Sequence, residues 1–535
     1  MTASSRGSAP EPATPRTGIP ERLSSRMSMA EQHAYLRTKL TRRRALRGGA
    51  ATAGVIAGSG LLGGSAAAGQ LSPALPTRAA PVRVDGSLVA PFGRHLAFGA
   101  DPKTQMRVSW QVPLAVRRPF IRIGVEPWEL SRRIEAEARD LHTPALTDAL
   151  PAVDQLYLHA ALDGLRPGTT YYYGVGHDGY DPAEPRRFAG LGTFRTAPAS
   201  SEKFVFTAFG DQGVSYDALA NDQLILGQNP SFHLHAGDIC YADSAGQGKE
   251  SDVYDARVWD QFLAQTESVA KSVPWMVTTG NHDMEAWYSP DGYGGQSARW
   301  SLPDNGPDAG RAPGIYSFVY ANTAVVALDA NDVSYEIPAN RGHTDGRQTK
   351  WLDRRLAALR ASPGVDFIVV FFHHCAFSTT SAHASEGGVR EEWVPLFEKH
   401  GVDLVVNGHN HVYERTDAIR GGEVAKPLPI GASVDSREGI VYVTAGGAGK
   451  ALYEFPAPDS YEGHVKDIER IDSYHWTKGA HRQRDEVEWS RVRYTGFSFI
   501  AVEVEPGRNP KLKVTALAEN GERVDHFEVT RPGRG

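Results

Sequence analysis

Aspartate, asparagine, histidine and tyrosine residues recur directly after short apolar runs between residues 204 and 411. In chain order they are Asp211 in FGDQG, Asp238 and Tyr241 in GDICY, Asn281 and His282 in GNHD, His373 in VFFHH, and His409 and His411 in GHNH. Carboxylates, phenolates, amides and imidazoles can all bind metal ions. One such residue has an ordinary explanation, because an aspartate after a strand often caps a helix. Five such motifs in succession predict a shared metal site.

The motifs have a common position, at the ends of the expected strands. In open α/β sheets, ligands bind outside the carboxyl ends of the strands, so side chains far apart in sequence can converge there. A glycine stands before the ligand in FGD, AGD, TGN and NGH. Glycine lets the chain turn sharply and lets the backbone approach a metal or a phosphate closely.

Residues 201–450 alternate apolar runs with helix-length amphipathic segments, which is typical of an α/β layered domain. The expected strands are 204–210, 232–238, 275–281, 323–330, 367–374, 402–409 and 440–446. The expected helices are 216–226, 256–270, 347–361 and 390–400. A charged, irregular surface excursion follows at 451–493, with His464, His475 and His481 as surface residues, and strands at 494–530 complete the domain.

Residues 85–197 have a different pattern, in which short alternating runs are separated by turn residues. The runs are MRVSWQV (106–112), FIRIGV (120–125), LYLHAAL (156–162) and YYYGVGH (171–177). This pattern predicts an all-β sandwich. The segment LRPGTTYYY, from Leu165, resembles the corner of fibronectin type III domains, and Trp110 lies in an earlier strand. We expect this domain to have a structural or positioning role.

The ordered set GD-x-G, GD-x-x-Y, GNH-D, V-x-x-H and GH-x-H resembles the motifs of purple acid phosphatases, within the binuclear metallophosphoesterases. The resemblance extends over roughly residues 85–530, because that family also joins a fibronectin-like domain to its catalytic domain. It implies an α/β sandwich of two mixed sheets flanked by helices. Tyr241 narrows the assignment, since other metallophosphoesterases lack a tyrosinate ligand at that position.

The resemblance also implies the ligands of two metal ions, which share Asp238. Fe(III) would be held by Asp211, Asp238, Tyr241 and His411, and a divalent Fe, Zn or Mn ion by Asp238, Asn281, His373 and His409. Carboxylate and phenolate oxygens suit a hard trivalent ion, and neutral imidazoles suit a borderline divalent one. Two ions about 3.5–4 Å apart would generate a hydroxide and clamp the phosphate for in-line attack.

Two histidines are expected to act on the substrate. His282 lies beside Asn281 in one motif, which would couple metal binding to a hydrogen bond with the phosphate. His383 occupies the position at which the family carries a histidine that protonates the leaving group. A neighbouring family histidine would fall at Ala382, so the outer phosphate pocket differs here and the substrate preference stays open. Asp283 is expected to orient its neighbours.

The N-terminal residues are basic and the rest of the chain is acidic. Residues 1–68 carry ten Lys/Arg and three Asp/Glu, which leaves 47 basic and 60 acidic residues after them. An acidic protein is a poor general binder of nucleic acid, whose affinity depends on neutralised phosphates. TRRRALR followed by a Gly/Ala-rich stretch resembles a twin-arginine export signal, with Arg42 and Arg43 as the pair. We expect an export signal at residues 1–68 and a linker at residues 69–84. The protein is expected to be bacterial and to be secreted or held in the cell envelope. The signal would contact the export machinery, and the mature protein would contact no membrane.

The sequence therefore predicts an acid phosphatase that acts on small phosphate monoesters. Two alternatives stay open: a phosphodiesterase or nucleotide hydrolase with the same two-metal site, and a secreted binding protein whose site is vestigial.

In FFHHCAF (371–377), alternation along a strand directs His374 away from His373. Cys240 and Cys375 both flank expected ligands, and we expect two buried free thiols, although a disulfide is possible in an exported protein.

Overall fold

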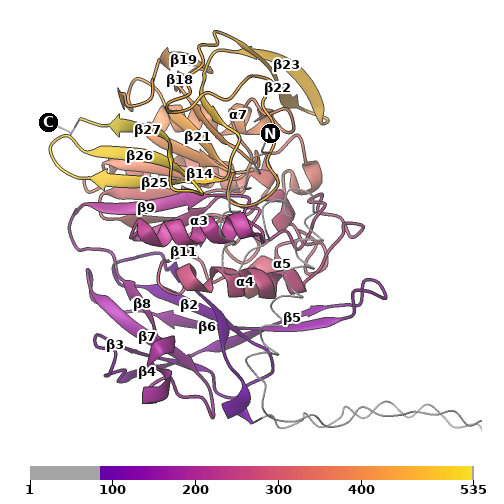
Figure 1. Ribbon diagram of the computed structural model, residues 1–535, viewed down its shortest axis with the longest axis vertical. Coiled ribbons are helices and arrows are strands. Elements are labelled where there is room, and N and C mark those ends of the chain that lie inside the picture. Colours follow the sequence, from indigo (N-terminus) through magenta and orange to yellow (C-terminus); the bar gives the residue numbers. More distant parts are fainter. Residues whose placement is uncertain (1–84, 533–535) are drawn as a thin grey trace, which may run out of the picture. The chain divides into compact units, whose positions relative to one another are not determined.

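The computed structural model describes residues 85–532, so the expected signal and linker lie outside the described residues. The first part is a β-sandwich, drawn in indigo to violet in Figure 1. One four-stranded sheet has the order β1-β2-β6-β5, with β1 Phe92–Phe98, β2 Met106–Val112, β6 Val153–Leu162 and β5 Glu137–Thr143. The other has the order β4-β3-β7-β8, with β4 Arg132–Glu135, β3 Phe120–Gly124, β7 Thr170–Gly176 and β8 Gly192–Arg195. The all-β prediction for this region is confirmed.

The second part contains two seven-stranded mixed sheets. The order of the first is β11 (Trp275–Val277), β10 (Phe232–His235), β9 (Phe204–Phe209), β25 (Ser498–Glu505), β26 (Lys511–Ala518), β27 (Arg523–Thr530) and β20 (Ser433–Asp435). The order of the second is β12 (Tyr316–Tyr320), β13 (Thr323–Ala327), β14 (Phe367–Phe372), β16 (Leu404–Asn407), β21 (Val441–Ala445), β17 (Tyr413–Thr416) and β24 (Ser490–Tyr494). Strands β9, β10 and β11 are mutually parallel, as are β13, β14, β16 and β21.

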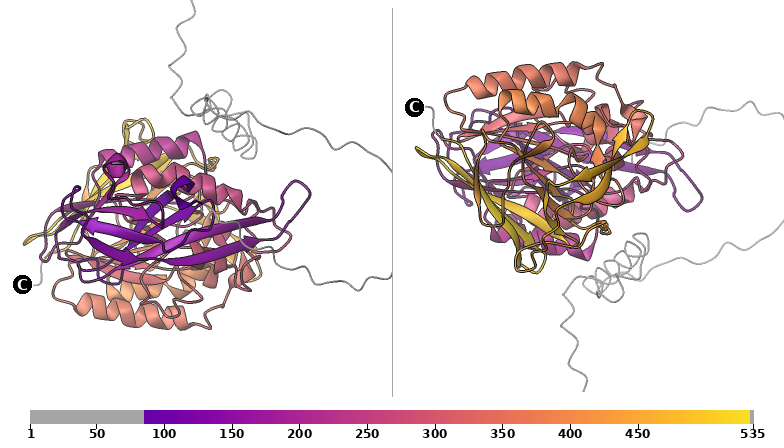
Figure 2. Two further views of the ribbon diagram at one scale, coloured as in Figure 1. Left: turned by 90° about the horizontal axis from the view of Figure 1, so that it is seen from below. Right: turned by 90° about the horizontal axis from the view of Figure 1, so that it is seen from above.

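Helices cover the outer faces of these sheets. Their bounds are α3 Tyr216–Gly227, α4 Arg257–Ala270, α5 Gly294–Arg299, α6 Arg347–Ala361, α7 Gly387–Glu392 and α8 Val394–His400. The magenta helix α3 and the salmon helix α6 lie on opposite sides of the paired sheets (Figure 2). The single helix expected at 390–400 is instead two, because Pro395 near the start of α8 cannot continue the backbone hydrogen bonds of α7. Within residues 85–532, no helix is both long and apolar enough to cross a bilayer.

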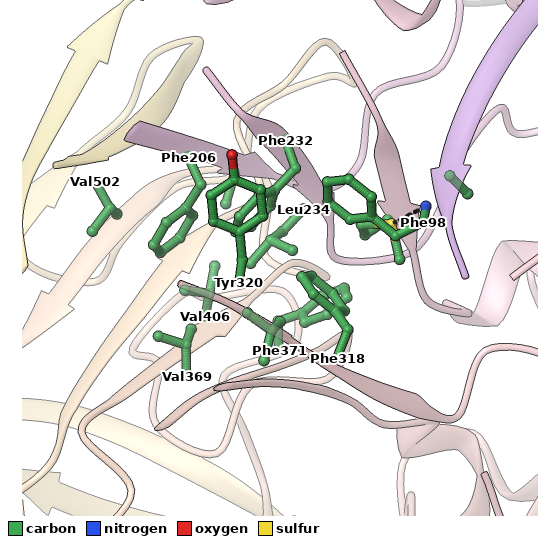
Figure 3. Packing of buried hydrophobic residues seen from close by; sticks show 14 of the residues in the cluster. Phe98, Phe206, Phe232, Leu234, Phe318, Tyr320, Val369, Phe371, Val406 and Val502 are labelled. Atoms are coloured by element: carbon green, nitrogen blue, oxygen red, sulfur yellow. Dashed lines mark hydrogen bonds between the residues drawn. The ribbon is translucent and has the colours of Figure 1, made fainter. Parts of the chain in front are cut away.

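The hydrophobic core lies between the two seven-stranded sheets. Phe206 and Phe232 of the first sheet and Val369, Phe371 and Val406 of the second belong to one buried cluster (Figure 3). All six residues of β14 are buried, because the sheets cover one face of this strand and helices the other. The predicted α/β architecture is confirmed, and the strand ends that carry the motifs are held by a rigid core.

The region 451–493 differs from the expected irregular excursion. It forms the hairpin of β22 (Ile471–Thr477) and β23 (His481–Val487), followed by β24. β22 pairs in parallel with the short β15 (Ser385–Glu386), and a separate hairpin joins β18 (Ala418–Arg420) to β19 (Glu423–Lys426). His464 and His481 are exposed as expected, whereas His475 is half-buried against Asp485. The sequence missed these strands because their charged side chains do not alternate with apolar ones.

Candidate metal centre

The side chains of the five motifs converge at the carboxyl ends of strands from both sheets. Asp211 follows β9, Asp238 and Tyr241 follow β10, and Asn281 begins the short 3₁₀ turn η3 (Asn281–Asp283) after β11. From the second sheet, His373 follows β14, and His409 and His411 follow β16. All seven of these side chains are buried. The structure therefore brings together every residue of the expected ligand set.

Four of these residues have a left-handed backbone conformation that is unusual for non-glycine residues. The φ angles are 63° at Asp211, 53° at Asp238, 59° at Tyr241 and 67° at His409. Such a conformation costs about 1–3 kcal/mol per residue, and it persists where the surrounding structure imposes it. Four strained residues after three neighbouring strands, gathered in one place, are typical of a functional site.

One group of donor atoms surrounds the Tyr241 phenol. Its Oη lies 3.1 Å from Asp211 Oδ1 and 3.0 Å from His411 Nε2. Asp211 Oδ1 is in turn 3.4 Å from His411 Nε2. This group supplies one phenol, one carboxylate and one imidazole, which is the donor chemistry of a hard, highly charged ion.

A second group surrounds His373 Nε2. This nitrogen lies 3.2 Å from Asp238 Oδ2, 3.1 Å from Asn281 Oδ1 and 3.2 Å from His409 Nδ1. One ligand atom each from Asp211, Asp238 and His373 lies within 4.8 Å of the others, so the two groups are contiguous. Asp238 therefore lies near donors of both groups, as a carboxylate shared by two ions would have to.

Each of the three imidazoles has an outward nitrogen, which points away from the donor groups, and an inward nitrogen, which faces them. The hydrogen bond of the outward nitrogen determines whether the inward nitrogen carries a proton or a lone pair. His373 Nδ1 donates to Ala236 O at 2.8 Å, and His411 Nδ1 donates to Ala451 O at 2.7 Å. His409 Nε2 donates to Glu336 Oε2 at 3.0 Å. A carbonyl or carboxylate can only accept, so in each neutral ring the inward nitrogen carries a lone pair. Lone pairs that face one another need a cation between them, and the residues present therefore fit two metal ions.

Electrostatics favour the same conclusion. Burial and the charges of Asp211 and Asp238 raise the pKa of Tyr241 well above its usual value. Its phenolate therefore requires a strongly charged cation nearby. Burial alone would raise the pKa of Asp238, but positive charge on the imidazoles of His373 and His282 would hold it well below its usual range, and metal ions would supply such charge where these rings are neutral.

Two further carboxylates orient the loops that carry the ligands. Asp283 accepts hydrogen bonds from the backbone N–H groups of Asp238 (2.9 Å), Ile239 (3.1 Å) and Gly280 (2.8 Å). It thereby links GDICY to GNHD without facing the donor groups. Burial and the Asp238 charge raise the pKa of Asp283 to about 8. The sequence did not single out Asp243. Its carboxylate accepts hydrogen bonds from the backbone N–H groups of residues 245 and 246.

Glycines allow these loops to approach each other. A Cβ added at Gly280 would lie 2.1 Å from Asp238 Oδ1. A Cβ added at Gly408 would lie 2.7 Å from Asp211 Oδ2 and 2.9 Å from Ala236 O. There is therefore no room for a side chain at Gly280 or Gly408, which agrees with the close backbone approach expected from the sequence.

A cavity of about 330 Å³ opens onto the donor groups, and both expected substrate histidines line it. His282 donates from Nδ1 to Asp243 O at 2.6 Å, and its backbone N–H donates to Asp238 Oδ1 at 2.8 Å, which leaves Nε2 for a ligand. Burial lowers the pKa of His282. His383 lies beside His409, with 4.2 Å between the ring centroids. The roles of His282 and His383 stay predictions.

The cavity also contains residues that the sequence did not reveal. Glu336, Tyr453 and Trp476 line it. The Tyr453 ring stacks on His411 at 4.1 Å, and Tyr453 Oη lies 3.2 Å from His383 Nε2. Lys450, the last residue of GGAGK, places Nζ 3.9 Å from the centroid of the Tyr241 ring. None of these four belongs to a spaced motif, and only the position of Lys450 and Tyr453 after a strand end could have indicated them.

In FFHHCAF, only His373 lies among the donor groups. His374 is buried with its ring 4.4 Å from that of His409. Cys240 and Cys375 are both free and buried, as expected, and Cys375 Sγ donates to Gly408 O at 3.0 Å. Burial raises the pKa of both thiols.

Comparisons with known proteins place both parts of the chain. Residues 91–206 match the purple acid phosphatase N-terminal domain, and residues 204–413 match the calcineurin-like phosphoesterase family. An uncharacterized protein of Mycobacterium tuberculosis is 30% identical over 484 residues, covering 83% of this chain and 88% of that protein. Purple acid phosphatase 15 of Arabidopsis thaliana is 28% identical over 326 residues, covering 57% of this chain and 58% of that protein.

A solved structure supports the same fold. The purple acid phosphatase isolated from yellow lupin (Lupinus luteus) seeds superposes with a TM-score of 0.62 at 20% identity, covering 83% of this chain and 75% of that chain. The family matches, together with the converging donor groups, support phosphoester hydrolysis at a metal centre. The chain therefore belongs to the calcineurin-like phosphoesterases, as a metallophosphoesterase with the N-terminal domain of purple acid phosphatases.

Proposed function

We propose that this protein is an exported acid phosphatase that hydrolyses small phosphate monoesters at an Fe(III)–divalent metal centre. The divalent ion would be Fe, Zn or Mn. The observation that carries the proposal is the phenol of Tyr241, 3.1 Å from Asp211 Oδ1 and 3.0 Å from His411 Nε2. A phenolate in an oxygen-rich donor set favours a trivalent ion over a divalent one.

The residues around the donor groups have separable tasks. A bound metal pair supplies an activated water and charge stabilisation for the phosphoryl group. Asn281 both faces the second donor group and donates from Nδ2 to Gly246 O at 3.1 Å, which fixes the orientation of its amide. His282 Nε2 is placed to hydrogen-bond a phosphate oxygen. His383 also lines the cavity, and its Nε2, beside Tyr453 Oη, would protonate the leaving oxygen.

The size of the cavity favours a monoester. Its volume of about 330 Å³ is near the lower end of ligand pockets. A phosphate with one modest substituent suits this volume better than a diester with two. Glu336 is a carboxylate among the lining residues, which disfavours further phosphates on the substrate by like-charge repulsion.

A visible spectrum with metal analysis of the purified protein tests the metal assignment. We expect about two metal ions per chain, at least one of them iron, and an intense band from charge transfer between tyrosinate and Fe(III). Tyr241→Phe should abolish the band because it removes the phenolate. A colourless, active enzyme without iron would refute the Fe(III) assignment and leave a divalent metallophosphoesterase.

Paired substrates test the ester class. We expect hydrolysis of p-nitrophenyl phosphate at acidic pH to exceed that of bis-p-nitrophenyl phosphate. The opposite preference would establish the phosphodiesterase alternative. If the purified protein bound no metal, and Asp211→Asn and His373→Asn left any residual hydrolysis unchanged, a binding protein with a vestigial site would be the better explanation.

Export is proposed from the sequence of residues 1–68, with Arg42 and Arg43 as the recognised pair. In a bacterial host with this export route, we expect the full chain outside the cytoplasm. Replacing both arginines with lysine should retain it inside, because the pair is what the export receptor reads. Equal export of both forms would contradict the proposed signal.

A further inference from the structure

The carboxylate of Glu336 contacts two imidazoles that belong to different parts of the site. His383 Nδ1 donates to Glu336 Oε1 at 2.6 Å, and His409 Nε2 donates to Glu336 Oε2 at 3.0 Å. The two rings lie side by side and tilted by 41°, with 4.2 Å between their centroids. Glu336 is mostly buried, with 9% of its side chain exposed. It belongs to none of the five motifs, and no pattern in the sequence indicates it.

For His409, the contact decides which ring nitrogen faces the donor groups. Nε2 carries the proton that Glu336 accepts, so Nδ1 keeps its lone pair toward His373 Nε2 and the space between them. A carboxylate on the outer nitrogen of a metal-binding imidazole also raises its basicity as a ligand.

For His383, the contact holds the Nδ1 side of a partly exposed ring. His383 is 25% exposed and stands in a loop. With Nδ1 bound to Glu336, the opposite nitrogen Nε2 is directed into the cavity, beside Tyr453 Oη at 3.2 Å. A group that protonates a leaving oxygen must be held within hydrogen-bond reach, because small misplacements cost large factors in rate.

A second carboxylate holds Glu336 itself in place. Glu386, three residues after His383, accepts hydrogen bonds from Tyr335 N at 2.8 Å and Glu336 N at 3.1 Å. It also accepts one from Ser334 Oγ at 2.8 Å. The segment around residue 336 thus contributes a carboxylate to His383. In return, β15, just after His383, contributes the Glu386 carboxylate to the Ser334 side chain and to the backbone of residues 335 and 336. The two loops are locked by reciprocal contacts.

We propose that Glu336 is a positioning residue that orients His383 for proton transfer and couples this orientation to the metal ligand His409. The inference rests on the proposed phosphatase function. As the oxygen of the attacking water bonds to phosphorus and the bond to the leaving oxygen breaks, the imidazolium of His383 passes its Nε2 proton to that oxygen. An alcohol leaves, and His383 becomes neutral with its remaining proton on Nδ1. Glu336 keeps the proton on Nδ1, so only Nε2 delivers one. The carboxylate itself transfers nothing to the substrate.

The test compares leaving groups of different basicity in wild type and Glu336→Gln. The glutamine keeps the size of the side chain, but its amide can accept from only one imidazole. A strongly basic alkoxide, as from glycerol 2-phosphate, needs protonation, whereas p-nitrophenolate does not. We expect kcat on glycerol 2-phosphate to fall about 10–100-fold and kcat on p-nitrophenyl phosphate about threefold or less, with the metal content unchanged.

Two further variants make the test specific. Glu391 accepts a hydrogen bond at 2.6 Å from the hydroxyl of Tyr335, the residue that precedes Glu336. Glu391 contacts neither the His383 nor the His409 imidazole. Glu391→Gln is therefore the matched control, and it should leave both activities unchanged. His383→Asn should give the same dependence on the leaving group. Combining it with Glu336→Gln should cost no further activity on glycerol 2-phosphate, because residues that act as one unit are not additive.

Failure of the role proposed for Glu336 can be distinguished from failure of the proposed phosphatase function. If Glu336→Gln lost metal and both activities fell equally, Glu336 would act on metal binding alone and the proposed orientation of His383 would be wrong. Unchanged activity on both substrates would also refute it. If metal-loaded wild type hydrolysed neither substrate, the proposed phosphatase function would fail and this inference with it.

Discussion

At the residue scale, the site is defined by what surrounds each ligand rather than by the ligands alone. Each imidazole of the donor groups has one nitrogen held by a fixed acceptor: Ala236 O, Ala451 O or Glu336. These acceptors determine which nitrogen can bind a cation. Lys450 adds a positive charge at 3.9 Å over the Tyr241 ring, where it attracts the π electrons.

The Lys450 contact leads to a spectroscopic prediction. In the iron-loaded protein, Lys450→Met should move the tyrosinate-to-iron band to longer wavelength, because the ammonium group lowers the energy of the phenolate electrons. The visible spectrum measures the shift directly. Lys399→Met, at an exposed ion pair with Asp353, is the control. An unchanged band at full iron content would show that the ammonium does not act on the phenolate.

A second residue-scale prediction concerns pH. His343 lies 3.4 Å from Asp332 and 3.5 Å from Asp329, and its Nδ1 also faces Asn340 O. Burial alone would lower its pKa, but the hydrogen bond to Asp332 and the two charges raise it to about 9. The stabilisation is complete below the ordinary pKa of about 6.5 and is lost as pH rises through about 9.

His343→Gln should therefore reduce the fall in thermal stability between pH 6 and pH 9.5. The lost contribution at pH 6 should be of the order of 2–3 kcal/mol, as a shift of this size implies. Melting curves of both proteins at the two pH values measure it. An equal pH dependence in the two proteins would mean that His343 is neutral in the fold.

At the element scale, the β22–β23 hairpin supports the loop that carries His383. Trp476 Nε1 donates to His383 O at 2.7 Å, and Tyr474 Oη donates to Ala382 O at 2.5 Å. The pairing of β15 with β22 extends this contact along the backbone. The hairpin thus forms one wall of the cavity and fixes the backbone of the proposed proton donor.

Trp476→Ala should lower kcat/KM about tenfold, which corresponds to about 1.4 kcal/mol, close to the net value of one hydrogen bond. The metal content should not change, because Trp476 contacts no residue of the donor groups. Steady-state kinetics on glycerol 2-phosphate, whose leaving group needs the proton of His383, together with metal analysis provide the measurement. Trp128→Ala, at a tryptophan that is 71% exposed in the sandwich, is the matched control. Equal kinetics for both variants would leave the hairpin without a role in the site.

At the scale of the whole molecule, the sandwich holds helix α5 of the α/β part. Its side chains donate to the carbonyl groups at the end of α5: Arg139 to Ser297 O and Trp300 O, His159 to Ala298 O, and His95 to Arg299 O. α5 also carries the Arg299 side chain, whose Nη1 lies 2.6 Å from Glu285 Oε2. Glu285 comes two residues after Asp283, so the sandwich is connected through α5 to the GNHD loop.

Arg299→Met should destabilise the protein by about 3–5 kcal/mol, because it leaves the Glu285 carboxylate buried without its partner. Adding Glu285→Gln should recover part of this loss, since the remaining group is neutral. Thermal unfolding measures both. Arg186→Met, which breaks an exposed pair with Glu184, should have almost no effect. A loss for Arg299→Met as small as this control would show that the ion pair contributes little.

The two-part architecture and the convergence of the motif side chains could both be predicted from the amino-acid sequence. Asp211, Asp238, Asn281, His373 and His409 stand at strand ends, and the apolar runs before them are long enough to identify the strands. Since the carboxyl ends of parallel strands meet, local sequence sufficed to predict which side chains converge. The ions, the substrate and export stay predictions.

The surroundings of these side chains could be known only from the folded chain. Glu336, Tyr453 and Trp476 come from loops and a charged hairpin, without hydrophobic periodicity to place them. Glu336 and His409 are 73 positions apart in sequence, and Trp476 and His383 are 93 apart. Such contacts join loops that are far apart in sequence and that lie next to each other only in the folded chain. The ligands could be read from strand ends, whereas the group that orients the proton donor could only be found in the folded chain.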